Sequence, residues 1–218
     1  MNYFQIAEGI TKYRDARNMQ RTIFDAPILR SIMRGFAGLY LRIIGWEALD
    51  NRNGEKNYVA IFAPHTSAWD FVNLIMLAMK LNIKTYWLGK HSLFRKRSAW
   101  LFRYLGGLPI DRTKKANTVE QIVHYFKEID DMVFTLAPEG TRKPVDRWKT
   151  GFYHMAVGAG VPIAIVSLDY KRRRGGISQM FYPTGDIKKD MIEIRGLYKD
   201  VVGKHPGRFV KLEDEVKL

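Results

Sequence analysis

The chain has 218 residues, of which 46% are hydrophobic and 27% are charged, so it is long enough to bury a core as one domain. Its 36 lysines and arginines against 22 aspartates and glutamates give a net charge of +14, which favours an anionic partner. The lack of cysteine excludes disulfides, thiolate zinc sites, iron–sulfur clusters and a cysteine nucleophile, and it fits a reducing compartment.

The N-terminal region is expected to contain neither a secretory signal nor a membrane-spanning helix. Residues 1–18 contain five charged side chains, so they lack the continuous apolar run of a signal. The apolar region Ile28–Trp46 is interrupted by Arg30, Arg34 and Arg42. The sequence therefore predicts neither secretion nor a helix that crosses a bilayer.

Residues 28–44 form an amphipathic pattern when they are placed on a helical wheel. The wider arc is apolar and contains Ile28, Leu29, Ile32, Met33, Phe36, Leu39, Tyr40, Ile43 and Ile44. The narrower arc contains Arg30, Ser31, Arg34, Gly35, Gly38 and Arg42, together with Leu41. Such a pattern is typical of a helix lying on a membrane surface and equally of a helix docked on a protein core. Both interpretations stay open at this point.

After residue 57, short apolar runs alternate with helical stretches. The predicted strands are Tyr58–Ala63, Thr85–Leu88, Met132–Leu136 and Pro162–Leu168, and the predicted helices lie near Phe71–Leu81, Thr118–Ile129 and Gly151–Ala159. Strands that alternate with helices indicate an α/β fold with a mostly parallel sheet flanked by helices. The basic cluster Lys171–Arg174 reads as a solvated turn.

The loops that follow the strands carry the chemistry, because in such sheets sites form at the carboxyl ends of the strands. After the first strand, His65 precedes Asp70 by five positions, so the two side chains are expected to face each other across the turn. The carboxylate would orient the imidazole, whose other nitrogen would then act as a general base. A structural alternative is that Asp70, with Ser67, only caps the following helix.

No nucleophile of the chain accompanies this pair. The sequence has no cysteine, no Gly-x-Ser-x-Gly elbow, no phosphate-binding Gly-x4-Gly-Lys-Ser/Thr loop and no His-Glu-x-x-His. The attacking group is therefore expected to be a substrate hydroxyl, from which His65 removes the proton.

Four blocks of the chain occur in the order and approximate spacing of a known family. They are His65–Asp70, Gly107–Arg112, Pro138–Arg142 and Val161–Ile163. With these blocks the chain resembles the glycerolipid, or lysophospholipid, acyltransferase superfamily, which includes the bacterial 1-acylglycerol-3-phosphate acyltransferases. The resemblance implies transfer of a fatty acyl group from a coenzyme A or acyl-carrier-protein thioester to the hydroxyl of a lipid precursor. It implies His65 as general base and Asp70 as the residue that orients it.

The resemblance also implies where the acceptor binds. The implied substrate-binding residues are Arg112, Glu139, Gly140, Thr141 and Arg142. A guanidinium can hold a phosphate through two charge-assisted hydrogen bonds. A backbone N–H near Gly140 is expected to stabilise the oxyanion, and Lys149 is a further candidate. The thioester is the co-substrate, and neither a cofactor nor a metal is expected.

Three residues depart from the family's usual pattern. Pro64 stands where Asn is common, Ala137 where Phe is common, and Lys143 where Ser is common. These departures leave the pair of His65 and Asp70 intact and leave the identity of the acceptor open.

The predicted organisation is an N-terminal helical, membrane-associating segment, 1–50, followed by an α/β acyltransferase domain, 51–218. The expected partners are an anionic membrane surface, a lipid acceptor and acyl-CoA or acyl carrier protein, with peripheral attachment to the cytoplasmic face of the inner cell membrane. Two alternatives are a basic nucleic-acid-binding protein and a lipid-binding relative without catalysis. No zinc-finger spacing or aromatic RNA-binding signature favours the first, and retention of both His65 and Asp70 disfavours the second.

Overall fold

A seven-stranded sheet forms the centre of the computed structural model, which describes residues 22–90, 94, 97, 99–110 and 115–209. The strands are β1 (Glu47–Asp50), β2 (Tyr58–Ala63), β3 (Thr85–Lys90), β4 (Gly107–Ile110), β5 (Val133–Leu136), β6 (Ile163–Asp169) and β7 (Arg174–Phe181). Their order across the sheet is β1-β7-β6-β2-β5-β3-β4. All neighbouring strands pair in parallel except β6 and β7, which form an antiparallel pair. The predicted α/β fold with a mostly parallel sheet is confirmed.

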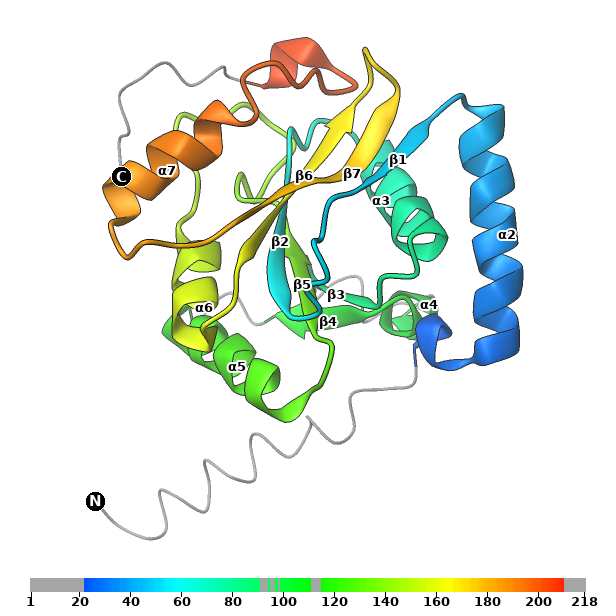
Figure 1. The fold of residues 1–218 in the computed structure, drawn as a ribbon, viewed down its shortest axis with the longest axis horizontal. Coiled ribbons are helices and arrows are strands. Elements are labelled where there is room, and N and C mark those ends of the chain that lie inside the picture. The colour runs from blue at the N-terminus through cyan, green and yellow to red at the C-terminus, as the bar shows by residue number, and fades with distance from the viewer. Residues whose placement is uncertain (1–21, 91–93, 95–96, 98, 111–114, 210–218) are drawn as a thin grey trace, which may run out of the picture.

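Helices cover both faces of this sheet (Figure 1). They are α2 (Pro27–Ile43), α3 (Trp69–Lys80), α4 (Ala99–Tyr104), α5 (Lys115–Glu128), α6 (Gly151–Ala159) and α7 (Ile187–Gly196), with 3-10 turns η1 (Ile23–Asp25) and η3 (Pro206–Arg208). The side chains of β2 alternate between the two faces, as a strand requires. Val59 and Ile61 pack with α5, α6 and α7, whereas Tyr58 and Ala60 pack with α3.

Helix α2 packs on α3 through one narrow seam and leaves a second apolar face uncovered. Ala37 and Leu41 are buried in the seam. The uncovered face, called the apolar stripe below, is 55–80% exposed and consists of Ile28, Ile32, Phe36, Leu39 and Ile43. One face of the helix packs on the protein core, as one of the two interpretations expects, and the other face is left uncovered. Contact with a membrane stays a prediction.

Most predicted elements appear close to their expected bounds, including α2, α3, α5, α6, β2, β3, β5 and β6. Residues 171–173 form the expected turn, but Arg174 begins β7, where it pairs with Asp169 and Glu47. Within the described residues, no helix is both long and apolar enough to span a bilayer. The boundary predicted after residue 50 stays a prediction, and the structure places α2 and β1 against the same sheet that the later residues build.

Glycine at position 176 is required where β1 approaches β7. Gly176 has a φ of +122°, and a Cβ there would lie 2.2 Å from the carbonyl oxygen of Leu49. We expect Gly176→Ala to lower the free energy of unfolding by about 3 kcal/mol, through backbone strain and overpacking together. Urea denaturation measures this loss.

Gly54 provides the matched control, because it also has a positive φ, +84°, but its Cβ would meet nothing within 4 Å. Gly54→Ala should lower the free energy of unfolding by only about 1 kcal/mol, because it adds backbone strain without overpacking. Equal losses in the two variants would contradict the role given to the close approach between β1 and β7.

Candidate active site

His65 lies in the loop between β2 and α3, at the carboxyl end of β2. Its Nδ1 is 3.1 Å from Oδ2 of Asp70, so the turn brings the two side chains together as the sequence predicts. Asp70 is fully buried, whereas the His65 side chain is 20% exposed. Nε2 of His65 makes no hydrogen bond to any residue that the structure describes. The ring therefore keeps one nitrogen open for a substrate.

The buried carboxylate of Asp70 is held by several donors. Its Oδ2 accepts hydrogen bonds from the backbone N–H groups of Thr66 and Ser67, each at 2.8 Å, and its Oδ1 accepts one from the hydroxyl of Tyr170 at 2.7 Å. Burial alone would raise the pKa of Asp70, but the hydrogen bonds from His65, Tyr170 and Ser67 outweigh it and lower the pKa below its usual range. Asp70 is therefore an anion at neutral pH.

The capping interpretation of Asp70 also holds in part. The carboxylate accepts the N–H of Ser67 just before α3 begins, and Oγ of Ser67 accepts the N–H of Trp69 at 3.2 Å. These contacts satisfy donors at the start of the helix. One carboxylate thus stabilises the helix start and orients His65, and the two interpretations do not exclude each other.

Glu139 supports the His65 loop from the neighbouring strand. It follows β5, is only 6% exposed, and accepts the backbone N–H of His65 at 2.8 Å. Burial raises the pKa of Glu139 to about 7, against the smaller opposing effect of that hydrogen bond. The family resemblance implies that Glu139 lines the acceptor site, whereas in the structure it accepts a hydrogen bond from the loop that carries His65. Contact with the acceptor stays a prediction.

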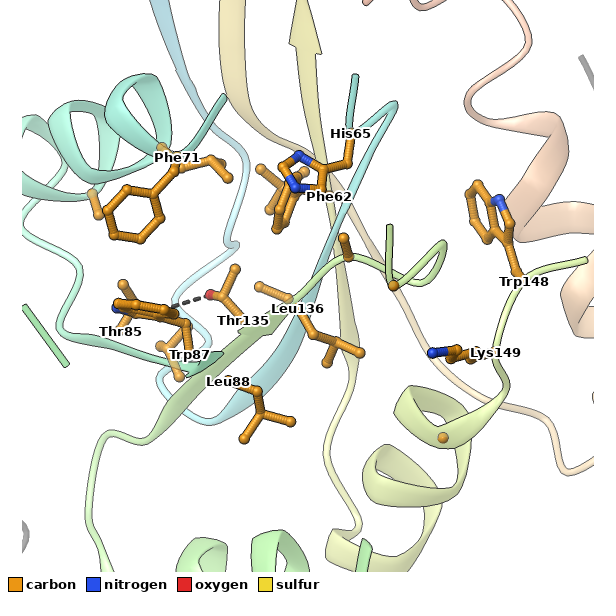
Figure 2. Close-up of a pocket in the computed structure, with 18 of the residues that line it drawn as sticks. Phe62, His65, Phe71, Thr85, Trp87, Leu88, Thr135, Leu136, Trp148 and Lys149 are labelled. Carbon is orange, nitrogen blue, oxygen red and sulfur yellow. Dashed lines mark hydrogen bonds between the residues drawn. The ribbon is translucent and has the colours of Figure 1, made fainter. Parts of the chain in front are cut away.

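A large cavity of about 1580 Å³ opens beside His65. One part, called the apolar arm, runs between α3 and the sheet, and its lining includes Tyr58, Ala60, Phe62, Phe71, Leu74, Ile75, Val133, Val166 and Ile177. Figure 2 shows His65 above Phe62, with Phe71 and Trp87 on one side and Trp148 and Lys149 on the other. His65 thus lies where the apolar arm meets a region of different chemistry.

The other part of the cavity, called the basic end, carries cationic side chains. They are Arg142, Lys143, Arg147, Lys149 and Arg208. Among the described residues that line the cavity, none is Asp or Glu. Such a surface favours an anionic group such as a phosphate.

A family model described as Acyltransferase matches residues 43–169, which is more than half of the chain. The chain belongs to this acyltransferase family. No curated protein sequence matches it. Among solved structures, the crystal structure of the 1-acyl-sn-glycerophosphate (LPA) acyltransferase PlsC from Thermotoga maritima is similar, with a TM-score of 0.49 and 18% sequence identity, covering 83% of this chain and 78% of that chain.

The predicted substrate-binding residues of this acyltransferase occupy different places. Thr141 and Arg142 line the cavity, and Arg142 is exposed at its basic end. Arg112 lies outside the described residues. The hypothesis that the two arginines hold one phosphate stays a prediction.

Gly140 lines the cavity but does not offer its own N–H to an oxyanion. That group donates to the carbonyl oxygen of Ala137 at 3.1 Å, so another backbone N–H near Gly140 would have to face the oxyanion, and this expectation stays a prediction. Gly140 has a φ of +65°, and a Cβ there would lie 2.7 Å from Nζ of Lys149. Glycine at this position therefore lets the Lys149 ammonium approach the loop closely.

The sequence did not single out two residues that lie beside the pair of His65 and Asp70, called the dyad below. Tyr170 donates to Asp70, and Nη1 of Arg208 donates to the carbonyl oxygen of Thr66 at 3.3 Å. Tyr170 lies two residues after the predicted strand Pro162–Leu168, and this position was the available signal. No local pattern singled out Arg208, which lies 142 residues from Thr66 in the chain.

We expect Glu139→Gln to change how stability depends on pH. In the unfolded chain Glu139 ionises near 4.5, whereas the folded protein holds the proton up to about 7, so wild type loses stability as pH rises between these values. Gln has no charge to bury, yet its side-chain oxygen still accepts the His65 N–H. Between pH 4.5 and pH 7.5, the free energy of unfolding should therefore fall by on the order of 2 kcal/mol less in the variant than in wild type.

Urea denaturation at the two pH values measures this difference. Glu193→Gln on α7 is the control, because Glu193 is exposed and the same charge is removed from water. If the free energy of unfolding depended on pH in the same way in the Glu139→Gln and Glu193→Gln variants, the idea that Glu139 is protonated in the folded protein would be contradicted.

Proposed function

We propose that this acyltransferase moves a fatty acyl group from an acyl-CoA or acyl-carrier-protein thioester to the hydroxyl of a lysophospholipid or related lipid precursor. The reaction would resemble that of the 1-acylglycerol-3-phosphate acyltransferases and serve phospholipid biosynthesis. The observation that carries the proposal is the position of His65. His65 lines a cavity that is apolar on one side and basic on the other, and its Nε2 is free of hydrogen bonds to the described residues.

The chemistry follows from the tautomer that Asp70 selects. With the proton on Nδ1 facing the carboxylate, Nε2 of His65 is free to take the proton of the acceptor hydroxyl. The acceptor oxygen then attacks the thioester carbonyl, the new C–O bond forms and the C–S bond breaks. The leaving thiolate takes the proton back from His65. None of these steps uses a cofactor, a metal or a nucleophile of the chain.

The two parts of the cavity fit the two ends of such substrates. The apolar arm would bury the acyl chain, which is stabilised by about 0.8 kcal/mol for each methylene removed from water. The basic end, which includes Arg142 and Lys149, would hold the phosphate of the acceptor or of the donor. The His65 imidazole would then meet the hydroxyl and the thioester where the two parts join.

Helix α2 would attach the enzyme to the bilayer that contains these substrates. Its apolar stripe is uncovered, and the exposed Arg30, Arg34 and Arg42 lie on the same helix. Apolar side chains entering the lipid boundary and arginines near anionic headgroups act together at such surfaces. The proposed location is the cytoplasmic face of the inner cell membrane, by peripheral attachment.

Substitution of the dyad tests the reaction. A panel of lyso-lipids with a long-chain acyl thioester, followed by mass spectrometry, should show transfer by wild type. His65→Ala should lower kcat by at least about 10²-fold, because no other group takes the hydroxyl proton. Asp70→Asn keeps the size of the side chain and should also lower kcat, because the amide cannot stabilise a protonated imidazole.

His154→Ala, an exposed histidine on α6, is the control and should transfer at the wild-type rate. An acyl group trapped on Ser67 or another side chain would refute direct transfer. No transfer to any acceptor by wild type, with lipid binding retained, would instead identify a lipid-binding relative without catalysis.

The apolar stripe is tested by exchanging Ile32, Phe36 and Leu39 together for Asn. These side chains are exposed, so the fold should tolerate the change. Binding to anionic vesicles should weaken at least about 10-fold, because three side chains no longer leave water. Co-sedimentation with vesicles containing phosphatidylglycerol measures the affinity.

The control exchanges Val157 on α6 and Ile192 on α7 for Asn, because both are exposed apolar residues on other helices. It should bind vesicles like wild type.

Charge reversal of Arg30, Arg34 and Arg42 to Glu should release the protein, whereas high salt should weaken binding only in part. Vesicle binding at wild-type affinity by the triple variant of the apolar stripe would show that α2 is not the anchor.

A further inference from the structure

Tyr170 connects the His65–Asp70 pair to helix α2 through a chain of side-chain hydrogen bonds. The Tyr170 hydroxyl donates to Oδ1 of Asp70 at 2.7 Å and accepts from Nδ2 of Asn73 at 3.1 Å. Oδ1 of Asn73 in turn accepts the hydroxyl of Tyr40, on α2, at 2.9 Å. These three hydrogen bonds therefore link α2, the helix with the apolar stripe, through α3 to the His65–Asp70 pair.

The two oxygens of Asp70 are held very differently. Oδ2 faces His65 and also accepts two backbone N–H groups, whereas the hydroxyl of Tyr170 is the hydrogen-bond donor that the described residues supply to Oδ1. Asp70 is fully buried, so water cannot easily take the place of a hydrogen-bond donor that is removed. Loss of the Tyr170 hydroxyl would therefore leave Oδ1 without a partner among the described residues, at a cost in free energy. The hydroxyl of Tyr170 thus stabilises the negative charge on Oδ1, the oxygen of Asp70 that faces away from His65.

Tyr170 itself is fixed in place. Its ring meets the ring of Trp46 edge-on, with the centroids 4.9 Å apart. Burial, followed by the hydrogen bond to Asp70, raises the pKa of Tyr170 above its usual range. The hydroxyl therefore keeps its proton and remains a donor wherever the enzyme is folded.

We propose that Tyr170 is a positioning residue for the His65–Asp70 pair, and that Asn73 and Tyr40 hold its hydroxyl in place from α3 and α2. The inference rests on the proposed function only in taking His65 as the general base. Tyr170 does not need to contact substrate, because it acts through Asp70.

The sign of its effect follows from charge. A donor to Oδ1 stabilises the negative charge of the pair, so its removal makes the pair bind a proton more readily. The titratable groups that face the pair are Glu139 after β5 and Tyr170 itself. Tyr40 on α2 lies behind Tyr170, and Arg208 supplies a cation at the His65 loop. Exchange of Tyr170 for Phe removes the donor while leaving the other groups in place.

The experiment is therefore Tyr170→Phe. We expect kcat to fall about 10- to 100-fold with little change in KM for either substrate, since the loss is in the base and not in binding. The acidic limb of the kcat/KM profile should move up by about half to one pH unit. The His65 imidazole resonances, followed by NMR titration, should show the same upward shift without any substrate.

Two matched tyrosines separate positioning from stability. The hydroxyl of Tyr153 donates to the buried Asp190 at 2.7 Å, and that of Tyr182 donates to Glu55 at 2.9 Å on the surface. Tyr153→Phe should lower the free energy of unfolding without moving the pH profile or the His65 titration. Tyr182→Phe should change neither.

The rest of the chain of hydrogen bonds is tested by Asn73→Leu and Tyr40→Phe. Both should shift the His65 titration in the same direction as Tyr170→Phe, by less, because the Tyr170 hydroxyl stays but is held less firmly. A Tyr170→Phe protein that loses only stability, as the Tyr153 control does, would overturn the inference. So would a change in KM alone.

Failure of the proposed function gives a different result. If wild type transfers no acyl group to any acceptor, the function is refuted, while the His65 titration still tests Tyr170. If wild type transfers and Tyr170→Phe matches it in kcat, pH profile and titration, only the positioning role is refuted.

Discussion

The buried charge of Asp70 is the constraint on which the site depends. A carboxylate withdrawn from water is stable only where hydrogen-bond donors replace the lost solvent. Here the donors come from the His65 loop and from the residue after β6, which the fold must therefore hold together. Strands β2 and β6 are neighbours in the sheet, so their carboxyl ends deliver these groups to one place. The same carboxylate also satisfies donors at the start of α3.

The chemistry of the cavity follows from the alternation of side chains along the sheet. The residues of β2 that face α3, such as Tyr58 and Ala60, are apolar and line the arm beneath that helix. The loop after β5 supplies Thr141 and Arg142, and η3 adds Arg208 beyond the edge of the strands. An apolar interior therefore ends in a cationic opening, with His65 between them.

The motif residues that the sequence singled out divide into two groups by what they touch. Arg142 and Thr141 face the cavity, whereas Glu139 is buried and accepts the N–H of His65. Proximity in the sequence did not distinguish the two groups, because adjacent residues of a turn point in different directions. The turn around Gly140, with its positive φ, is what sends Glu139 inward and leaves Arg142 exposed.

The sequence by itself determined the elements and contacts that are local. Strands β2, β5 and β6 are short, mostly apolar runs, which favour buried strands, and His65 and Asp70 are five residues apart across one turn. Strands β4 and β7 were missed because Pro109 and the pair Gly175–Gly176 oppose the usual strand pattern.

Only the tertiary structure decided which distant groups complete the site. Tyr170 lies 100 residues from Asp70, and its role depends on β6 pairing with β2. The division of α2 into a packed seam and an exposed stripe depends likewise on where α3 lies against it. Periodicity shows that a helix is amphipathic, but the choice of which apolar side chains are covered is made by the neighbouring surface.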